Sequence, residues 1–146
     1  MIKLTTNGPE MEPGAAATQT LGAIAAKGGG KSYLAGVFAE QLDAEHVPFI
    51  VIDPIGNWCW LRLAADGKSP GVPIVVVGGE RGDVPLESDQ GEALGRFLVE
   101  KRASAVLDVS AFSKTHRKTF VADLCEAIYR AARVDRVPRM VIFEEA

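Results

Sequence analysis

The feature that most constrains the fold is a glycine-rich stretch near the N-terminus, Ala25-Ala26-Lys27-Gly28-Gly29-Gly30-Lys31-Ser32. The apolar residues before it predict a buried strand, which we expect to run from Gln19 to Ala25. Apolar residues at helical spacing follow it and predict a helix to about Glu45. Strand, glycine turn, Lys-Ser and helix occur in the order of a phosphate-binding loop (P-loop).

The residue types in this stretch suit phosphate chemistry. Glycines lack Cβ, so they tolerate positive φ angles and let consecutive backbone N–H groups surround an anion. The following helix adds unpaired N–H donors and a partial positive charge at its N-terminus. We expect Lys31 to reach the terminal phosphates and the Ser32 hydroxyl to bind Mg²⁺. The full pattern begins with glycine, whereas this chain has Ala25. The alternative is a flexible glycine turn beside an ordinary lysine.

Composition limits the classes of protein that fit. With 146 residues, the chain is long enough for one domain with a buried core. Its net charge of −3 gives no global case for nucleic acid, although a local basic patch is compatible with it. Cys59 and Cys125 lie too far apart for a metal-ligand spacing. No apolar run suits a membrane span or a signal peptide, so we expect a cytoplasmic protein with reduced thiols and no membrane contact.

The remaining sequence alternates between predicted strands and helices. Residues 1–18 are predicted as an N-terminal arm, mostly loop, with an edge strand at Met1–Thr5 as an option. Residues 19–146 are predicted as one nucleotide-binding domain. Its α/β fold would contain a mainly parallel sheet with right-handed crossovers. The further strands are expected at Val47–Asp53, Gly71–Val77, Ala103–Val109 and Met140–Phe143, and the further helices after caps at Ser88 and Ser113, the last ending near Arg133.

Three predicted strands end in an acidic residue that could hold Mg²⁺ opposite the loop: Asp53, Asp108 and Glu144. Only Glu144 is followed by a second carboxylate, Glu145, so one can hold the metal shell while the other accepts a proton from water. This pair favours hydrolysis over transfer to a small substrate; its alternative is a solvated tail. Asp53, at the carboxyl end of a strand, is explained equally well by a turn.

Aromatic and basic residues each have a structural and a binding interpretation. Trp58 and Trp60 are better explained by packing than by stacking on bases. A solvated helix face explains the basic residues more simply than a DNA-binding patch does. These basic residues are Lys114, Arg117, Lys118, Arg130, Arg133, Arg136 and Arg139.

Together these motifs resemble the HerA/FtsK superfamily of P-loop ATPases, and the HerA-like branch in particular. The resemblance rests on the loop ending Gly-Gly-Gly-Lys-Ser-Tyr (Walker A), on Asp53-Pro54 with Gly56 soon after, and on the closing Glu144-Glu145-Ala146 (Walker B). The turn Gly78-Gly79 with Gly82-Asp83 and Pro85-Leu86 is also similar to that branch. The resemblance covers residues 19–146.

This resemblance implies a RecA-like core and an ATP-driven motor that acts in DNA translocation or processing. It implies ATP and Mg²⁺ as cofactors, a homo-oligomeric ring, double-stranded DNA bound by the full-length assembly, and a partner nuclease. It makes Lys31 and Glu145 catalytic residues. It makes Ser32 and Glu144 metal ligands, and it assigns Asp53 to the metal with less definition. The residues it places around the nucleotide are Ala26, Lys27, Gly28, Gly29, Gly30, Lys31, Ser32 and Tyr33.

The chain also departs from the family pattern. Ala25 replaces the first loop glycine, and Asn57 replaces a typical glutamate. Family members continue with a strand between the loop strand and the Glu-Glu strand, bearing a polar sensor, and with an arginine finger. These 146 residues contain neither, so we expect a fragment with weak or no hydrolysis alone and with exposed apolar strand edges. Two other functions stay open. One is a P-loop kinase or other phosphotransferase using Asp108 or Asp53. The other is a non-catalytic nucleotide-binding or assembly module.

Overall fold

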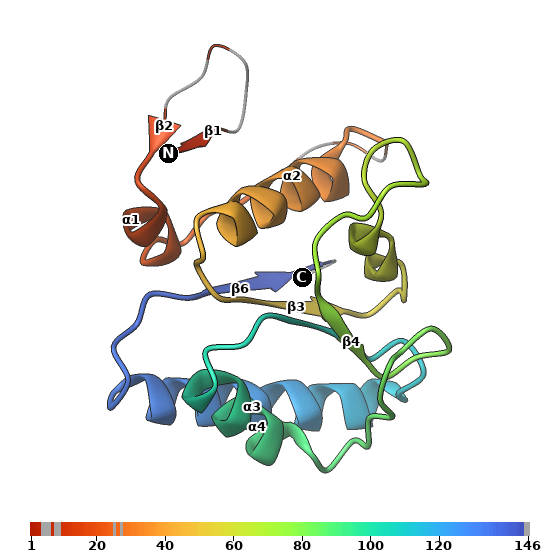
Figure 1. Cartoon of the computed structure of the whole chain (residues 1–146). Coiled ribbons are helices and arrows are strands. Elements are labelled where there is room, and N and C mark those ends of the chain that lie inside the picture. Colours follow the sequence, from red (N-terminus) through yellow and green to blue (C-terminus); the bar gives the residue numbers. More distant parts are fainter. Residues whose placement is uncertain (4–6, 8–9, 25, 27, 145–146) are drawn as a thin grey trace.

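Four short apolar segments form a parallel sheet in the computed structural model, which describes residues 1–3, 7, 10–24, 26 and 28–144 (Figure 1). All three strand pairings are parallel, as the continuous apolarity of the segments predicts. The expected α/β fold with a parallel sheet is therefore confirmed. In spatial order the strands are β4 (Val75–Val77), β5 (Ala105–Asp108), β3 (Phe49–Asp53) and β6 (Met140–Phe143).

Helices cover both faces of this sheet (Figure 1). Successive side chains of a strand point to opposite faces, so each strand contributes to two cores. In β3, Phe49 and Val51 pack in the core beneath the first helix layer, and Ile50 and Ile52 pack in the core beneath the second. The first layer is α2 (Lys31–Ala44) with the short 3₁₀ helix η1 (Trp58–Arg62); the second is α3 (Gly91–Glu100) with α4 (Lys114–Ala132).

Glycines set the closest contacts within each layer. A Cβ on Gly91 would lie 2.6 Å from the carbonyl oxygen of Phe120, and one on Gly95 would lie 2.8 Å from that of Leu124. The backbones of α3 and α4 therefore approach each other closely. On the opposite face, a Cβ on Gly36 would lie 2.2 Å from the indole ring of Trp60. This contact and the complete burial of Trp58 agree with the packing interpretation of the tryptophans.

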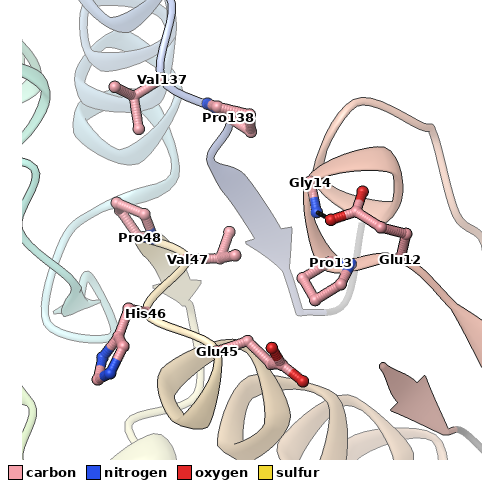
Figure 2. Close-up of a pocket in the computed structure, with 9 residues that line it drawn as sticks. All are labelled: Glu12, Pro13, Gly14, Glu45, His46, Val47, Pro48, Val137 and Pro138. Atoms are coloured by element: carbon pink, nitrogen blue, oxygen red, sulfur yellow. Dashed lines mark hydrogen bonds between the residues drawn. The ribbon is translucent and has the colours of Figure 1, made fainter.

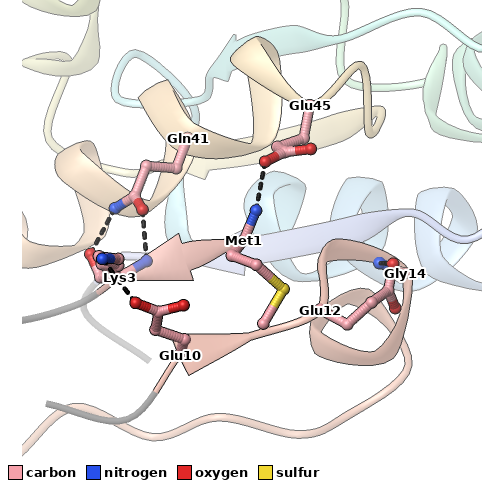
Figure 3. Close-up of polar contacts among 7 residues, drawn as sticks. All are labelled: Met1, Lys3, Glu10, Glu12, Gly14, Gln41 and Glu45. Carbon is pink, nitrogen blue, oxygen red and sulfur yellow. Dashed lines mark hydrogen bonds and ion pairs between the residues drawn. The ribbon is translucent and has the colours of Figure 1, made fainter.

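The N-terminal arm is more ordered than the predicted loop. Strands β1 (Ile2–Lys3) and β2 (Glu10–Met11) pair antiparallel in a separate small sheet, and α1 (Pro13–Ala17) follows. The Gln41 side chain holds β1 against α2, accepting from the Lys3 N–H at 2.5 Å and donating to the Lys3 carbonyl at 2.6 Å (Figure 3). The ammonium group of Met1 pairs with Glu45 at 2.5 Å (Figure 3). Within the described part of the expected Met1–Thr5 strand, Ile2–Lys3 therefore pairs with β2 and not with the main sheet.

Two sequence-based expectations about elements are wrong. Residues 20–24 of the expected loop strand form no regular structure, and Ile24 is fully exposed. A strand needs a hydrogen-bonded neighbour, and in the described part of the chain β6 pairs with β3 alone. Ser88 does not cap a helix, because α3 begins at Gly91 with Gln90 as its N-cap. By contrast, Ser113 does cap α4, accepting from the His116 N–H at 3.2 Å. Among the described residues, no helix has the length and apolar character needed to cross a bilayer.

Candidate nucleotide-binding site

The described part of the glycine-rich loop has the backbone shape that phosphate binding needs. Gly28 and Gly30 adopt φ angles of 79° and 81°, which L-residues with side chains rarely adopt. Gly30 is the N-cap residue of α2 and has no side chain to occupy the first N–H groups of the helix. A Cβ on either glycine would meet no atom within 4 Å. The loop is therefore shaped by glycine conformation and not by surrounding contacts.

The start of α2 and the end of β6 meet through one hydrogen bond. The Ser32 hydroxyl donates to Glu144 Oε1 at 2.5 Å, although 112 positions separate the two residues. The Glu144 N–H donates to the Ile52 carbonyl at 3.3 Å, so the β3–β6 ladder holds its backbone. Two residues predicted to share a metal therefore lie side by side at the carboxyl end of the sheet.

The other predicted loop residues are placed only in part. Gly29 and Ala26 are exposed, and the Gly29 N–H donates to the Ala26 carbonyl at 2.9 Å. Lys31 lies half-buried in the first turn of α2, and Tyr33 is 71% exposed. The predictions for Lys27 and Glu145, as well as the departure at Ala25, lie outside the described residues.

Asp53 does not face the loop as an open ligand. Its carboxylate accepts hydrogen bonds from the N–H groups of Ile55, Gly56 and Trp58 at 2.8–2.9 Å, and the residue is 1% exposed. This is the turn interpretation of the strand end. As a metal ligand Asp53 would have to release some of these N–H groups, so the geometry favours its structural role.

Asp108, at the end of β5, is also buried, with 6% of its surface exposed. Its Oδ1 accepts from the backbone N–H and the hydroxyl of Ser110, at 2.9 and 2.6 Å. It lines a cavity of about 350 Å³ at the carboxyl ends of β3, β4 and β5, which we call the β3–β5 crevice. The crevice is lined by Ile55, Gly56, Asn57, Gly79, Glu80, Arg81, Asp108, Ser110 and Ala111. Sequence reasoning missed this site, although the glycines after the third predicted strand signalled an unusual turn.

A second cavity of about 290 Å³ lies at the opposite end of the strands, where the chain enters β3 and β6 (Figure 2). Its lining includes three prolines, Pro13, Pro48 and Pro138, which provide no side-chain donor or acceptor. The Glu12 carboxylate caps α1 there, accepting from the Gly14 and Ala15 N–H groups at 3.0 and 2.6 Å. The Glu12 carboxylate therefore serves the local structure.

The basic residues do not form one patch. Lys114 and Arg133 flank the two ends of α4, about 28 Å apart at about 1.5 Å per residue. Arg130 pairs with Glu126 one turn away, and Arg139 is largely buried against Asp135. This distribution agrees with a solvated helix surface better than with a continuous DNA-binding stripe.

Comparison with known proteins adds no family. No protein-family model, curated protein or solved structure matches the chain. Within the described residues, no group of three or more His, Cys, Asp or Glu side chains is placed to hold a metal by itself.

Proposed function

We propose that the chain binds ATP·Mg²⁺ through its glycine-rich loop and belongs to a HerA/FtsK-like P-loop ATPase with a RecA-like core. The hydrogen bond between Ser32 and Glu144 supports this proposal, because the loop pattern assigns Ser32 to Mg²⁺ and the acidic strand end assigns Glu144 to the same ion. Hydroxyl and carboxylate oxygens are hard ligands of the kind that Mg²⁺ prefers. The donors therefore fit this ion, which uses few protein ligands and completes its shell with phosphate oxygens and water. The ion would neutralise charge on the phosphates.

The backbone beside this pair supplies the anion-binding half of the proposed site. No side chain caps the N-terminus of α2, which adds a partial positive charge beside Gly28–Gly30. Lys31 lies in the first turn of the helix, where its ammonium group would contact the terminal phosphates. The roles of Lys27 and Glu145 in this site remain predictions from the sequence.

The test is a ligand-dependent melting temperature. With ATP·Mg²⁺ at about a hundred times its Kd, binding would stabilise the folded chain by about 2.7 kcal/mol, or a shift of roughly 5–10 °C. Lys31→Ala should abolish the part of the shift that depends on Mg²⁺, and chelation of Mg²⁺ should remove the same part in the wild type. Lys118→Ala, an exposed lysine on α4, is the matched control and should keep the full shift. A Mg²⁺-dependent shift that persists in Lys31→Ala would overturn the proposal.

A second candidate is a non-catalytic nucleotide-binding or assembly module. The exposed, irregular segment 20–24 supports it, because a catalytic P-loop needs a firmly held strand before it. The two candidates differ in turnover. The ATPase proposal expects at most weak phosphate release by these residues alone, which Glu145→Gln abolishes while binding persists, whereas the module expects binding alone. A phosphotransferase is less supported, because Asp53 and Asp108 already accept hydrogen bonds within their own turns.

Double-stranded DNA, a ring assembly and a nuclease partner rest on the resemblance and remain proposals. A DNA contact through α4 predicts affinity that falls steeply with salt, with a slope reduced by about 1 for each phosphate-contacting arginine removed. Arg133→Ala tests this directly. Arg96→Ala on α3 is a matched control, since Arg96 is exposed and on another helix. An unchanged salt slope in Arg133→Ala would remove that residue from the proposed DNA contact.

A further inference from the structure

The topology leaves a crevice where β3 and β5 lie side by side. The chain after β3 turns toward the α2 face and forms η1, whose Trp58 and Leu61 pack in the core on that side. The chain after β5 turns toward the opposite face and forms α4. Adjacent parallel strands whose continuations leave on opposite faces open a crevice at their carboxyl ends, and α/β proteins place ligands there. The β3–β5 crevice occupies this position.

Glycine backbone forms part of the crevice wall. A Cβ on Gly79 would lie 1.9 Å from Asp108 Oδ2, and one on Gly56 would lie 3.0 Å from the Ser110 hydroxyl oxygen. Both glycines adopt positive φ angles, of 69° and 83°. Side chains at these positions would displace Asp108 or Ser110, so the glycines allow the polar groups to line the cavity in fixed positions.

The polar groups in the crevice differ from those of the phosphate loop. Asp108 is held by Ser110, so its carboxylate has a defined orientation. Glu80 and Asn57 add a second carboxylate and an amide, and Arg81 adds a guanidinium group. One Arg81 N–H donates to the Cys59 sulfur at 3.6 Å, and a guanidinium carries five N–H donors in all.

We propose that the β3–β5 crevice binds a phosphorylated sugar, either free or as part of a nucleotide. Carboxylates accept hydrogen bonds from sugar hydroxyls, as Asp108 and Glu80 would, while the Arg81 guanidinium pairs with phosphate oxygens. A volume of about 350 Å³ is within the range of small-molecule sites. The carboxylates favour this ligand over a bare anion, because the sugar offers hydroxyl donors whose hydrogen bonds the carboxylates can accept.

The experiment measures binding of ribose 5-phosphate and of AMP to the Lys31→Ala chain by calorimetry, so that the phosphate loop cannot account for the signal. Both probes should bind, with Arg81→Ala weakening the affinity tenfold or more. Arg96→Ala, a similarly exposed arginine on α3, should leave the affinity unchanged. Tighter binding of AMP identifies a nucleotide as the source, whereas equal affinities identify the free sugar phosphate.

Three results would overturn the proposal. The first is no binding of either probe to the Lys31→Ala chain. The second is equal affinity for inorganic phosphate and ribose 5-phosphate, which would leave a bare anion site. The third is binding unaffected by Arg81→Ala, which would place the ligand elsewhere. Asn57→Ala gives a second measure of the same site, since Asn57 is exposed, and it should weaken binding without loss of folding.

Discussion

The phosphate loop and the β3–β5 crevice both lie at the carboxyl end of the sheet, but they are built differently. At the loop, the left-handed glycines are exposed and a Cβ would contact nothing within 4 Å. In the crevice, a Cβ on Gly79 would collide with a buried carboxylate. Loop geometry therefore depends on the local freedom of the backbone, whereas crevice geometry depends on packing between three strands. Glycine is therefore needed for its backbone conformation in the phosphate loop, and in the crevice it is also needed to allow close packing.

The largest expected effect is that of Gly79→Ala. The new Cβ would require Asp108 to move, and the alanine would have to adopt a left-handed backbone conformation. We therefore expect the free energy of unfolding to fall by about 3 kcal/mol or more. Gly28→Ala is the matched change in the phosphate loop and should cost only about 1–2 kcal/mol from backbone strain. Urea unfolding of both variants measures the difference. Equal losses would show that packing does not distinguish the two sites.

The second effect concerns the buried carboxylate beside the crevice. Asp53→Ala leaves three backbone N–H groups without their acceptor, one of them in a buried turn, so we expect a loss of about 2–3 kcal/mol. Ser32→Ala removes one exposed hydrogen bond to Glu144 and should change stability by less than about 1 kcal/mol. The same unfolding measurement ranks them. A larger loss in Ser32→Ala would reverse the comparison.

The smallest effect lies outside both sites and provides a reference for them. Arg102, with Arg139, holds the pKa of Asp135 below its ordinary value of 3.8. Because the pKa is lower in the folded chain, the ion pair stabilises folding above about pH 3.8, and this contribution is lost as pH falls through the folded-state value. Arg102→Ala should reduce that acid-dependent loss. Thermal melts between pH 2 and pH 6 would detect this difference. Identical pH dependence of the melting temperature in the wild type and in Arg102→Ala would contradict the prediction.

The sequence predicted the strands and long helices well where local and tertiary preferences agree. The apolar run ending at Asp53 is buried on both faces, and Ser113 caps α4 as its position suggests. The strand before the glycine loop could not be predicted correctly from local pattern, because a strand forms only beside a neighbour. The helix cap at Ser88 was likewise wrong, since α3 begins only where Gly91 can approach α4.

The candidate site was predictable only as far as local motifs reach. The pairing of Ser32 with Glu144 follows from the order of motifs, which places both at the carboxyl end of the sheet. The crevice was not found, because it depends on which strands become neighbours and on which face each connection leaves the sheet. Arg81 and Asn57 lie in two turns that are separated in sequence, and no local pattern indicates that these turns meet.

The close glycine contact between α3 and α4 has a mechanical consequence. Because no side chains separate the two helix backbones at Gly91 and Gly95, we expect α3 and α4 to move together as one rigid unit. Two walls of the crevice, after β4 and β5, lead into these helices, whereas the third leads into η1 in the other layer. A molecule bound between the walls would therefore link the two helix layers. Because α3 and α4 are in close contact, a displacement of the wall after β4 would be transmitted to the wall after β5.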